Sequence, residues 1–106
     1  NTYVDSLMPA AARLGDTIST GHGCDATSTI AGALISKVKI DGIIAAVIGD
    51  AIAAHTIPSG PSCVPHSATV GGSSSKVKFQ GIYAARVGDG ADGGSITSGS
   101  PDVIIG

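Results

Sequence analysis

Hydrophobic and polar residues alternate along two short stretches of the chain. The sequence reads Lys-Val-Lys-Ile over residues 37–40 and Lys-Val-Lys-Phe over residues 76–79. A period of two residues is typical of a β-strand that has one face in water and one face against a core. Both stretches are therefore predicted to be strands, and they contain every lysine of the protein.

Each predicted strand is followed by a dipeptide that favours a tight turn, Asp41-Gly42 in one case and Gln80-Gly81 in the other. Such pairs suit the two central residues of a hairpin turn, which both need a positive φ. We expect a second strand to run back after each turn, over residues 43–48 and 82–87.

The returning strands belong to a motif that occurs three times. Residues 11–16, 45–50 and 84–89 each read Ala-Ala, two further residues, then Gly-Asp. Three related copies predict an all-β fold with units of about 11–42, 43–81 and 82–106, which together can bury one core. The alternative is a small β-meander whose copies resemble one another by accident.

The composition agrees with short strands joined by turns. The 106 residues include 13 Ile and 8 Val against 3 Leu, 16 Gly, and no Glu. The net charge of −2, without a basic run, gives no support for nucleic-acid binding. Residues 1–7 read differently from the rest, so we expect a vector-derived remnant or a flexible arm, with Met8 starting a single domain over 8–106.

All histidines and cysteines fall in the two long loops that follow the first two Gly-Asp pairs. The first loop holds His22 and Cys24, and the second holds His55, Cys63 and His66. The third loop, over residues 90–94, holds none and is predicted to be a plain turn.

The spacing of Cys63 and His66 suits two ligands of a metal ion in a tight turn. Thiolate and imidazole together favour tetrahedral Zn²⁺, and four protein ligands would close the site and make it structural. Such a staple would support a small domain with few aromatic residues. Two alternatives are histidines that are merely solvated and a disulfide between Cys24 and Cys63, which would leave the histidines without a role.

Several motifs, in the same order, resemble those of the PAAR-repeat proteins. Residues 9–16 look like the PAAR motif with its following Gly-Asp, and residues 84–89 repeat it. Residues 20–24 look like the first loop of the family, and residues 97–106 look like its closing strand. The second loop, from Ala54 to His66, also resembles its counterpart, so the likeness extends over residues 8–106.

The resemblance implies a small cone of three β-hairpin units with a zinc ion near its vertex. In the family, the blunt base docks on a trimeric β-helical spike, and the tip pierces a target envelope when a phage tail or type VI secretion sheath contracts. Three histidines and one cysteine hold the zinc. Carried over to this sequence, the ligands are His22, His55, Cys63 and His66, and Cys24 could exchange with Cys63.

The sequence departs from the family pattern at three places. The first motif has an extra Ala, Val47 stands where an arginine is expected, and residues 73–75 are Ser-Ser-Ser where the family has Gly-Ser-Pro. The missing arginine argues against a strict threefold role for Arg13 and Arg86, which we expect to be ordinary solvated or strand-edge residues.

These features predict a structural protein and no enzyme, because a hydrolase would need an open metal position and a general base. With no Glu in the chain, only an Asp such as Asp25 could serve as that base. The expected partner is one spike trimer per monomer, with transient contact to a target membrane and no nucleic acid. The expected location is the virion tail tip or a secreted apparatus assembled in the cytoplasm. The alternative function is a zinc-binding adaptor that links an effector to the spike, and we expect no effector to be fused after Gly106.

Overall fold

The computed structural model describes residues 9–106, and this part of the chain contains strands and turns without a helix. The expected start at Met8 and the expected arm over residues 1–7 lie outside the described residues. The all-β prediction is confirmed. Since residues 9–106 form no helix, they include none that could cross a membrane.

The strands are β1 (Thr17–Ser19), β2 (Thr27–Gly32), β3 (Lys39–Ile40), β4 (Ile43–Ile44), β5 (Ala51–Ile52), β6 (His55–Ser59), β7 (Ser62–His66), β8 (Lys78–Phe79), β9 (Ile82–Tyr83), β10 (Gly90–Ala91) and β11 (Gly94–Ser95).

The two predicted hairpins are present, with the turns in the predicted places, but their strands cover only two residues each and are shorter than predicted. β3 pairs antiparallel with β4, and β8 pairs antiparallel with β9. Asp41 and Gly42 have φ of 55° and 77°, and Gln80 and Gly81 have φ of 52° and 82°. Two successive positive φ values are what a type I′ turn requires, and its twist matches that of the flanking strands.

The end of the chain pairs with its beginning in the same way that the two sides of each hairpin pair. The amide of Ala45 donates to the carbonyl of Val38, and the amide of Ala84 donates to that of Val77, both at 2.9 Å. Ala11 makes the equivalent 2.9 Å bond to Val103, which lies near the C-terminus. The closing segment therefore pairs with the first Ala-Ala copy in the same way that the segments before the other two copies pair with those.

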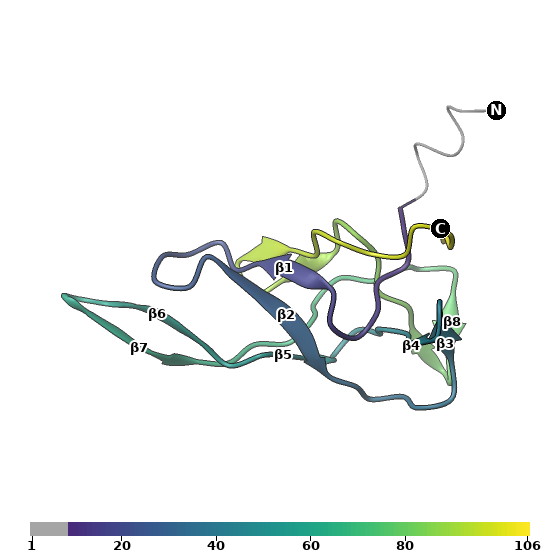
Figure 1. Ribbon diagram of the computed structural model, residues 1–106, viewed down its shortest axis with the longest axis horizontal. Coiled ribbons are helices and arrows are strands. Elements are labelled where there is room, and N and C mark those ends of the chain that lie inside the picture. The colour runs from purple at the N-terminus through teal and green to yellow at the C-terminus, as the bar shows by residue number, and fades with distance from the viewer. Residues whose placement is uncertain (1–8) are drawn as a thin grey trace.

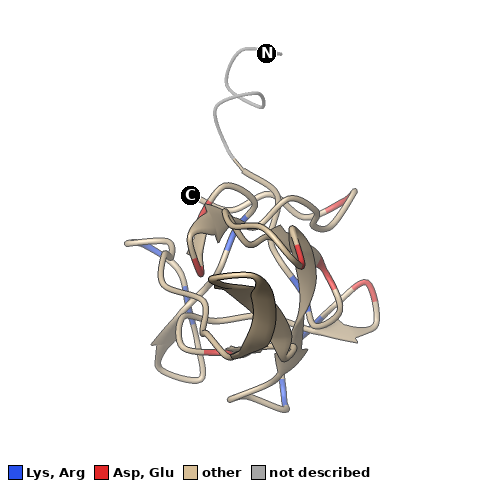
Figure 2. Ribbon diagram, turned by 90° about the vertical axis from the view of Figure 1, so that its left-hand side faces the viewer, with Lys and Arg blue, Asp and Glu red and all other residues tan. Residues whose placement is uncertain are grey.

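The three Ala-Ala copies are joined in a ring by backbone hydrogen bonds. Ala12 donates to Ala85 at 3.0 Å, Ala85 donates to Ala46 at 2.9 Å, and Ala46 donates to Ala12 at 3.0 Å. All three alanines have no exposed surface, because three backbones approach one another here and leave space only for a methyl group. Figure 2, which faces one end of the molecule, shows the strands and turns arranged around this common centre.

Each copy ends in the same capped turn, in which the carboxylate of the Asp accepts a hydrogen bond from the backbone three residues earlier. The donors are the amides of Arg13, Val47 and Arg86, at 2.7, 2.9 and 2.8 Å. The glycine before each Asp has a φ near 90°, a conformation that favours glycine. The turns send all three loops toward the same end of the ring.

The arginines differ from the prediction, because they are bound within their own units. Arg13 contacts Asp16 at 3.1 Å and Asp41 at 3.2 Å, and Arg86 contacts Asp89 at 2.8 Å. Asp41 lies in the turn of the β3–β4 hairpin, which leads into the second Ala-Ala copy, so Arg13 also links the first copy to the second.

The second copy, which has Val47 in place of the arginine, uses a backbone donor instead. Leu34 donates its amide to the Asp50 carboxylate at 2.9 Å. Burial raises the pKa of Asp50, and the two hydrogen bonds from Val47 and Leu34 partly offset this effect.

The core has two apolar layers, and the three alanines of the ring belong to the layer beneath the loops. One layer includes Ile18, Ile30 and Ile96, which underlie the loops, and the other includes Ile40 and Ile105 from the hairpins. In Figure 1 the β6–β7 hairpin projects at one end of the molecule, and β3, β4 and β8 lie at the opposite end.

Enlarging one alanine of the ring should destabilise the whole fold. We expect Ala46→Val to lower the free energy of unfolding by about 1–3 kcal/mol, because the added methyl groups have no space beside the neighbouring backbones. Urea unfolding measures the change at fixed metal concentration. Ala31→Val, at an exposed position of β2, is the control and should have little effect. Equal stabilities of the two variants would contradict the ring as the structural centre.

Candidate metal centre

Three loops bring four side chains together at the end where the β6–β7 hairpin projects. His22 lies in the bend after β1, and Asp92 lies in the turn between β10 and β11. His55 begins β6 and His66 ends β7, where the two are directly paired across the hairpin. One ligand atom from each of the four residues lies within 4.8 Å of the other three.

The three imidazole rings surround the Asp92 carboxylate. Its Oδ2 atom lies 2.8 Å from Nε2 of His22 and 2.7 Å from Nε2 of His55, and its Oδ1 atom lies 3.1 Å from Nε2 of His66. The ring centroids are 5.1–5.5 Å apart. All three Nε2 atoms therefore face one small volume.

The other ring nitrogens of two histidines are fixed by the backbone. Nδ1 of His22 lies 3.0 Å from the carbonyl oxygen of Gly23, and Nδ1 of His55 lies 2.8 Å from that of Ala53. A carbonyl oxygen only accepts hydrogen bonds, so we assign the proton of each neutral ring to Nδ1. Nε2 then carries a lone pair that points at an oxygen of the Asp92 carboxylate. Since that oxygen also only accepts hydrogen bonds, the two atoms cannot form a hydrogen bond with each other.

Two arrangements would remove this contact between acceptors. Either each Nε2 carries a proton, or a cation lies between the rings and the carboxylate. Metal-ligating histidines in proteins commonly donate their second nitrogen to a carbonyl in this way, which orients the ring and fixes its tautomer. The donor set of three imidazole nitrogens and one carboxylate oxygen suits a divalent transition metal. The group of His22, His55, His66 and Asp92 can therefore hold a metal ion.

The electrostatics of the group keep the carboxylate ionised. Burial alone would raise the pKa of Asp92, but when Nε2 of His22, His55 and His66 carries a proton, the hydrogen bonds from these rings outweigh burial and lower the pKa to about 2. The pKa of His22 is raised, first by its bond to the Gly23 carbonyl and further by Asp92, against the opposing effect of burial. Asp92 is thus an anion at any pH at which the histidines can bind a metal.

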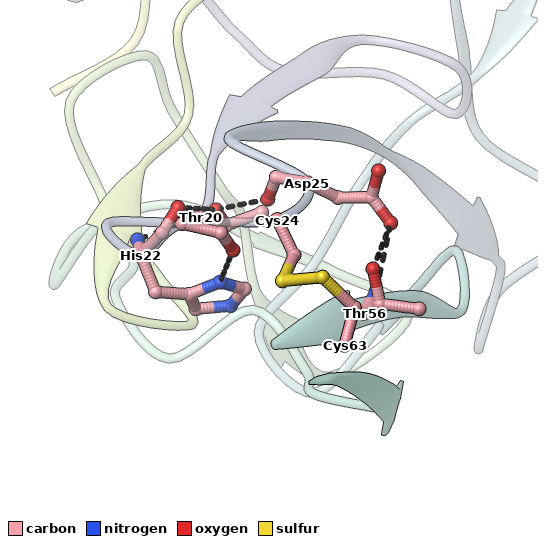
Figure 3. Close-up of a disulfide and its surroundings, with 7 residues drawn as sticks. Thr20, His22, Cys24, Asp25, Thr56 and Cys63 are labelled. Carbon is pink, nitrogen blue, oxygen red and sulfur yellow. Dashed lines mark hydrogen bonds between the residues drawn. A yellow bond between two sulfur atoms is a disulfide. The ribbon is translucent and has the colours of Figure 1, made fainter. Parts of the chain in front are cut away.

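The structure brings together the three predicted histidines but not the predicted cysteine. Cys63 forms a disulfide with Cys24, so its sulfur is not free to bind a metal as predicted (Figure 3). The physical reason is that β7 runs in an extended conformation through both Cys63 and His66. Side chains three residues apart on a strand point to opposite faces, so the ligand spacing of a tight turn does not apply. The alternative of a disulfide is correct, and the histidines have a partner in Asp92.

Asp92 is the residue that sequence reasoning missed, because the third loop was expected to be a plain turn. The signal that could have found it is the repeat itself. If the first two loops meet at one end, the third loop must reach the same end, and Asp92 is its only potential metal ligand. Asp92 lies in the short turn between β10 and β11, where its φ is 56°.

Asp25, the one carboxylate considered as a general base, is used to fix the first loop. Its Oδ2 accepts hydrogen bonds from the amide and the hydroxyl of Thr56, each at 2.8 Å (Figure 3). These bonds lower the pKa of Asp25. They also connect the first loop to β6, which carries His55.

A comparison with models of known protein families finds no match, and none is found among curated proteins. The likeness to PAAR-repeat proteins therefore rests on the sequence motifs, and what it implies about function is a hypothesis.

Removing the charge of Asp92 should weaken metal binding. We expect Asp92→Asn to reduce the affinity for Zn²⁺ by at least about tenfold, because the fourth ligand loses its charge while Asn still tolerates the positive φ. Competition with a chromophoric chelator measures the affinity. Asp102→Asn, at an exposed site in the closing segment, should bind as the unaltered chain does. Equal affinities of the two variants would show that Asp92 is not a ligand of the metal.

Proposed function

We propose that this chain is a spike-tip protein of a contractile injection machine, either a phage tail baseplate or a type VI secretion system. One copy caps and sharpens the end of a trimeric β-helical spike, which then pierces the envelope of a target cell. The tip works as a virion or secreted component after assembly in the bacterial cytoplasm, and its contact with the target membrane is transient.

The observation that carries the proposal is the ring formed by Ala12, Ala46 and Ala85. Three successive hydrogen bonds of 2.9–3.0 Å run in one direction around a single chain and return to their start. One polypeptide thereby acquires three related sides. Such a monomer fits the end of a threefold partner, because each of its sides can meet one chain of the trimer.

The hairpin end offers an apolar surface for that contact. The side chains of Ile43, Tyr83 and Ile104 are large and apolar, and 39%, 39% and 45% of their surfaces are exposed. Three valines that occupy equivalent places in the two hairpins and the closing segment are only partly buried: Val38, Val77 and Val103. Docking this end on the spike would cover apolar surface that is otherwise in water.

At the opposite end, a zinc ion would join the three loops into a narrow tip. His22, His55 and His66 would each supply Nε2, and Asp92 would supply a carboxylate oxygen. Zinc bound in this way supplies ligand bonds that cross-link the loops. Four protein ligands complete a tetrahedral sphere, which makes the site structural. The proposal therefore includes no catalytic step, and the rigidity of the tip is its contribution to piercing.

The stoichiometry of the complex with the spike tests this function. Native mass spectrometry of the chain mixed with a trimeric β-helical spike protein should show one copy per three spike chains. A complex of three copies with three chains, or no complex, would contradict the cap.

A pair of matched variants locates the contact. Ile43→Asp, beside the turn of the β3–β4 hairpin, should weaken the complex by at least about tenfold, because it places a charge in the docked apolar surface. Leu34→Asp is the control, because Leu34 is 59% exposed and packs beside Gly49, which lies in a Gly-Asp turn and not in a hairpin turn. The same loss in both variants would argue against docking through the hairpin end.

A further inference from the structure

The disulfide lies beside the metal cluster in sequence and in space. Cys24 follows His22 by two residues, and Cys63 precedes His66 by three. The bond joins parts of the chain that are 39 residues apart. Figure 3 shows it between the loop that carries His22 and the hairpin that carries Cys63.

Besides the disulfide, the loop that carries His22 is held by the close packing of Gly21 against the backbone of Gly93 and by polar contacts. Residues 23–27 are all exposed, and no strand forms between β1 and β2. Its remaining supports are polar: Asp25 contacts Thr56, and the hydroxyl of Thr20 donates to the carbonyl oxygens of His22 and Asp25 at 3.3 and 2.6 Å. The disulfide is therefore the one covalent restraint on this loop within residues 9–106.

We propose that Cys24 and Cys63 are positioning residues for the metal cluster, so that disulfide formation and metal binding stabilise each other. The inference rests on the metal site of the proposed function and adds a dependence on redox conditions. The bond places the His22 loop against the β6–β7 hairpin before the metal arrives. Without it, the loop must be ordered at the moment of binding, and this ordering reduces the affinity.

Reduction does not offer the metal a better ligand in exchange. Cys63 and His66 lie at odd spacing along β7, so the freed thiol of Cys63 remains on the face opposite to the imidazole. Within residues 9–106, the group placed to hold a metal consists of His22, His55, His66 and Asp92, and reduction loosens the loop that carries His22. Reduced protein should bind Zn²⁺ about tenfold more weakly than oxidised protein, the lower end of the effect seen when the support of a metal ligand is lost.

Because the coupling is reciprocal, the metal must protect the disulfide by the same factor. The reductant is a thiol such as glutathione. Two glutathione thiols supply two electrons and two protons, the bond between the two Sγ atoms breaks, two cysteine thiols form, and glutathione disulfide is released. For this two-electron couple, a tenfold effect lowers the midpoint potential by about 30 mV.

The test compares the full chain in graded glutathione buffers, with and without a fixed free concentration of Zn²⁺. Alkylation and mass spectrometry measure the reduced fraction. We expect Zn²⁺ to lower the midpoint potential by about 30 mV in the unaltered chain. In Asp92→Asn, which lacks the charged fourth ligand, the shift should be much smaller.

A second measurement uses the double variant Cys24→Ser and Cys63→Ser, in which both altered positions are exposed, at a temperature where circular dichroism shows that it is folded. Chelator competition should show its Zn²⁺ affinity to be about tenfold below that of the oxidised chain. Tight Zn²⁺ binding with no shift in potential and no loss in the double variant would overturn the coupling and leave the metal site standing. Tighter binding by the reduced chain would also overturn it, and a chain that binds no Zn²⁺ in either state would overturn both proposals.

Discussion

The ring of backbone hydrogen bonds through Ala12, Ala46 and Ala85 is the constraint on which the rest of the structure depends. It needs a residue no larger than alanine at each position, and all three are fully buried. It also needs the chain to return to its starting point, which the closing strand achieves by pairing with Ala11. Once the ring is closed, the Gly-Asp turns direct every loop to one end and every hairpin turn away from it.

The chemistry of the molecule comes from the differences between the copies. Three similar loops would present three similar groups, but here the first carries one histidine, the second two, and the third a single carboxylate. Asp92 faces all three Nε2 atoms at 2.7–3.1 Å, and backbone carbonyls fix the tautomers of two histidines. The symmetric body brings the loops together, and their unequal sequences make the cluster. The Cys24–Cys63 bond then restrains the loop that carries His22.

Local patterns in the sequence predicted the β3–β4 and β8–β9 hairpins, their I′ turns and the three histidines of the cluster, because these depend on residues close together in the chain. The longer strands β2, β6 and β7 lie in segments that were expected to be loops. The disulfide was weighed as an alternative, but its choice over a Cys63 ligand depends on β7 being extended through His66, which spacing alone does not show. Asp92 could not be found locally, because a short Asp-Gly turn has the same sequence whether or not it meets a metal cluster. Arg13 was misjudged for a similar reason, since its partner Asp41 lies in another unit.

We expect the three loops to form one metal centre of three imidazoles and one carboxylate, with both sulfurs outside it. X-ray absorption spectroscopy of the oxidised, zinc-loaded protein tests this directly. The expected spectrum shows only nitrogen and oxygen neighbours, at about 2.0–2.2 Å from the metal. A sulfur neighbour at about 2.3 Å would contradict it, because one of the cysteines would then have left the disulfide to bind the zinc.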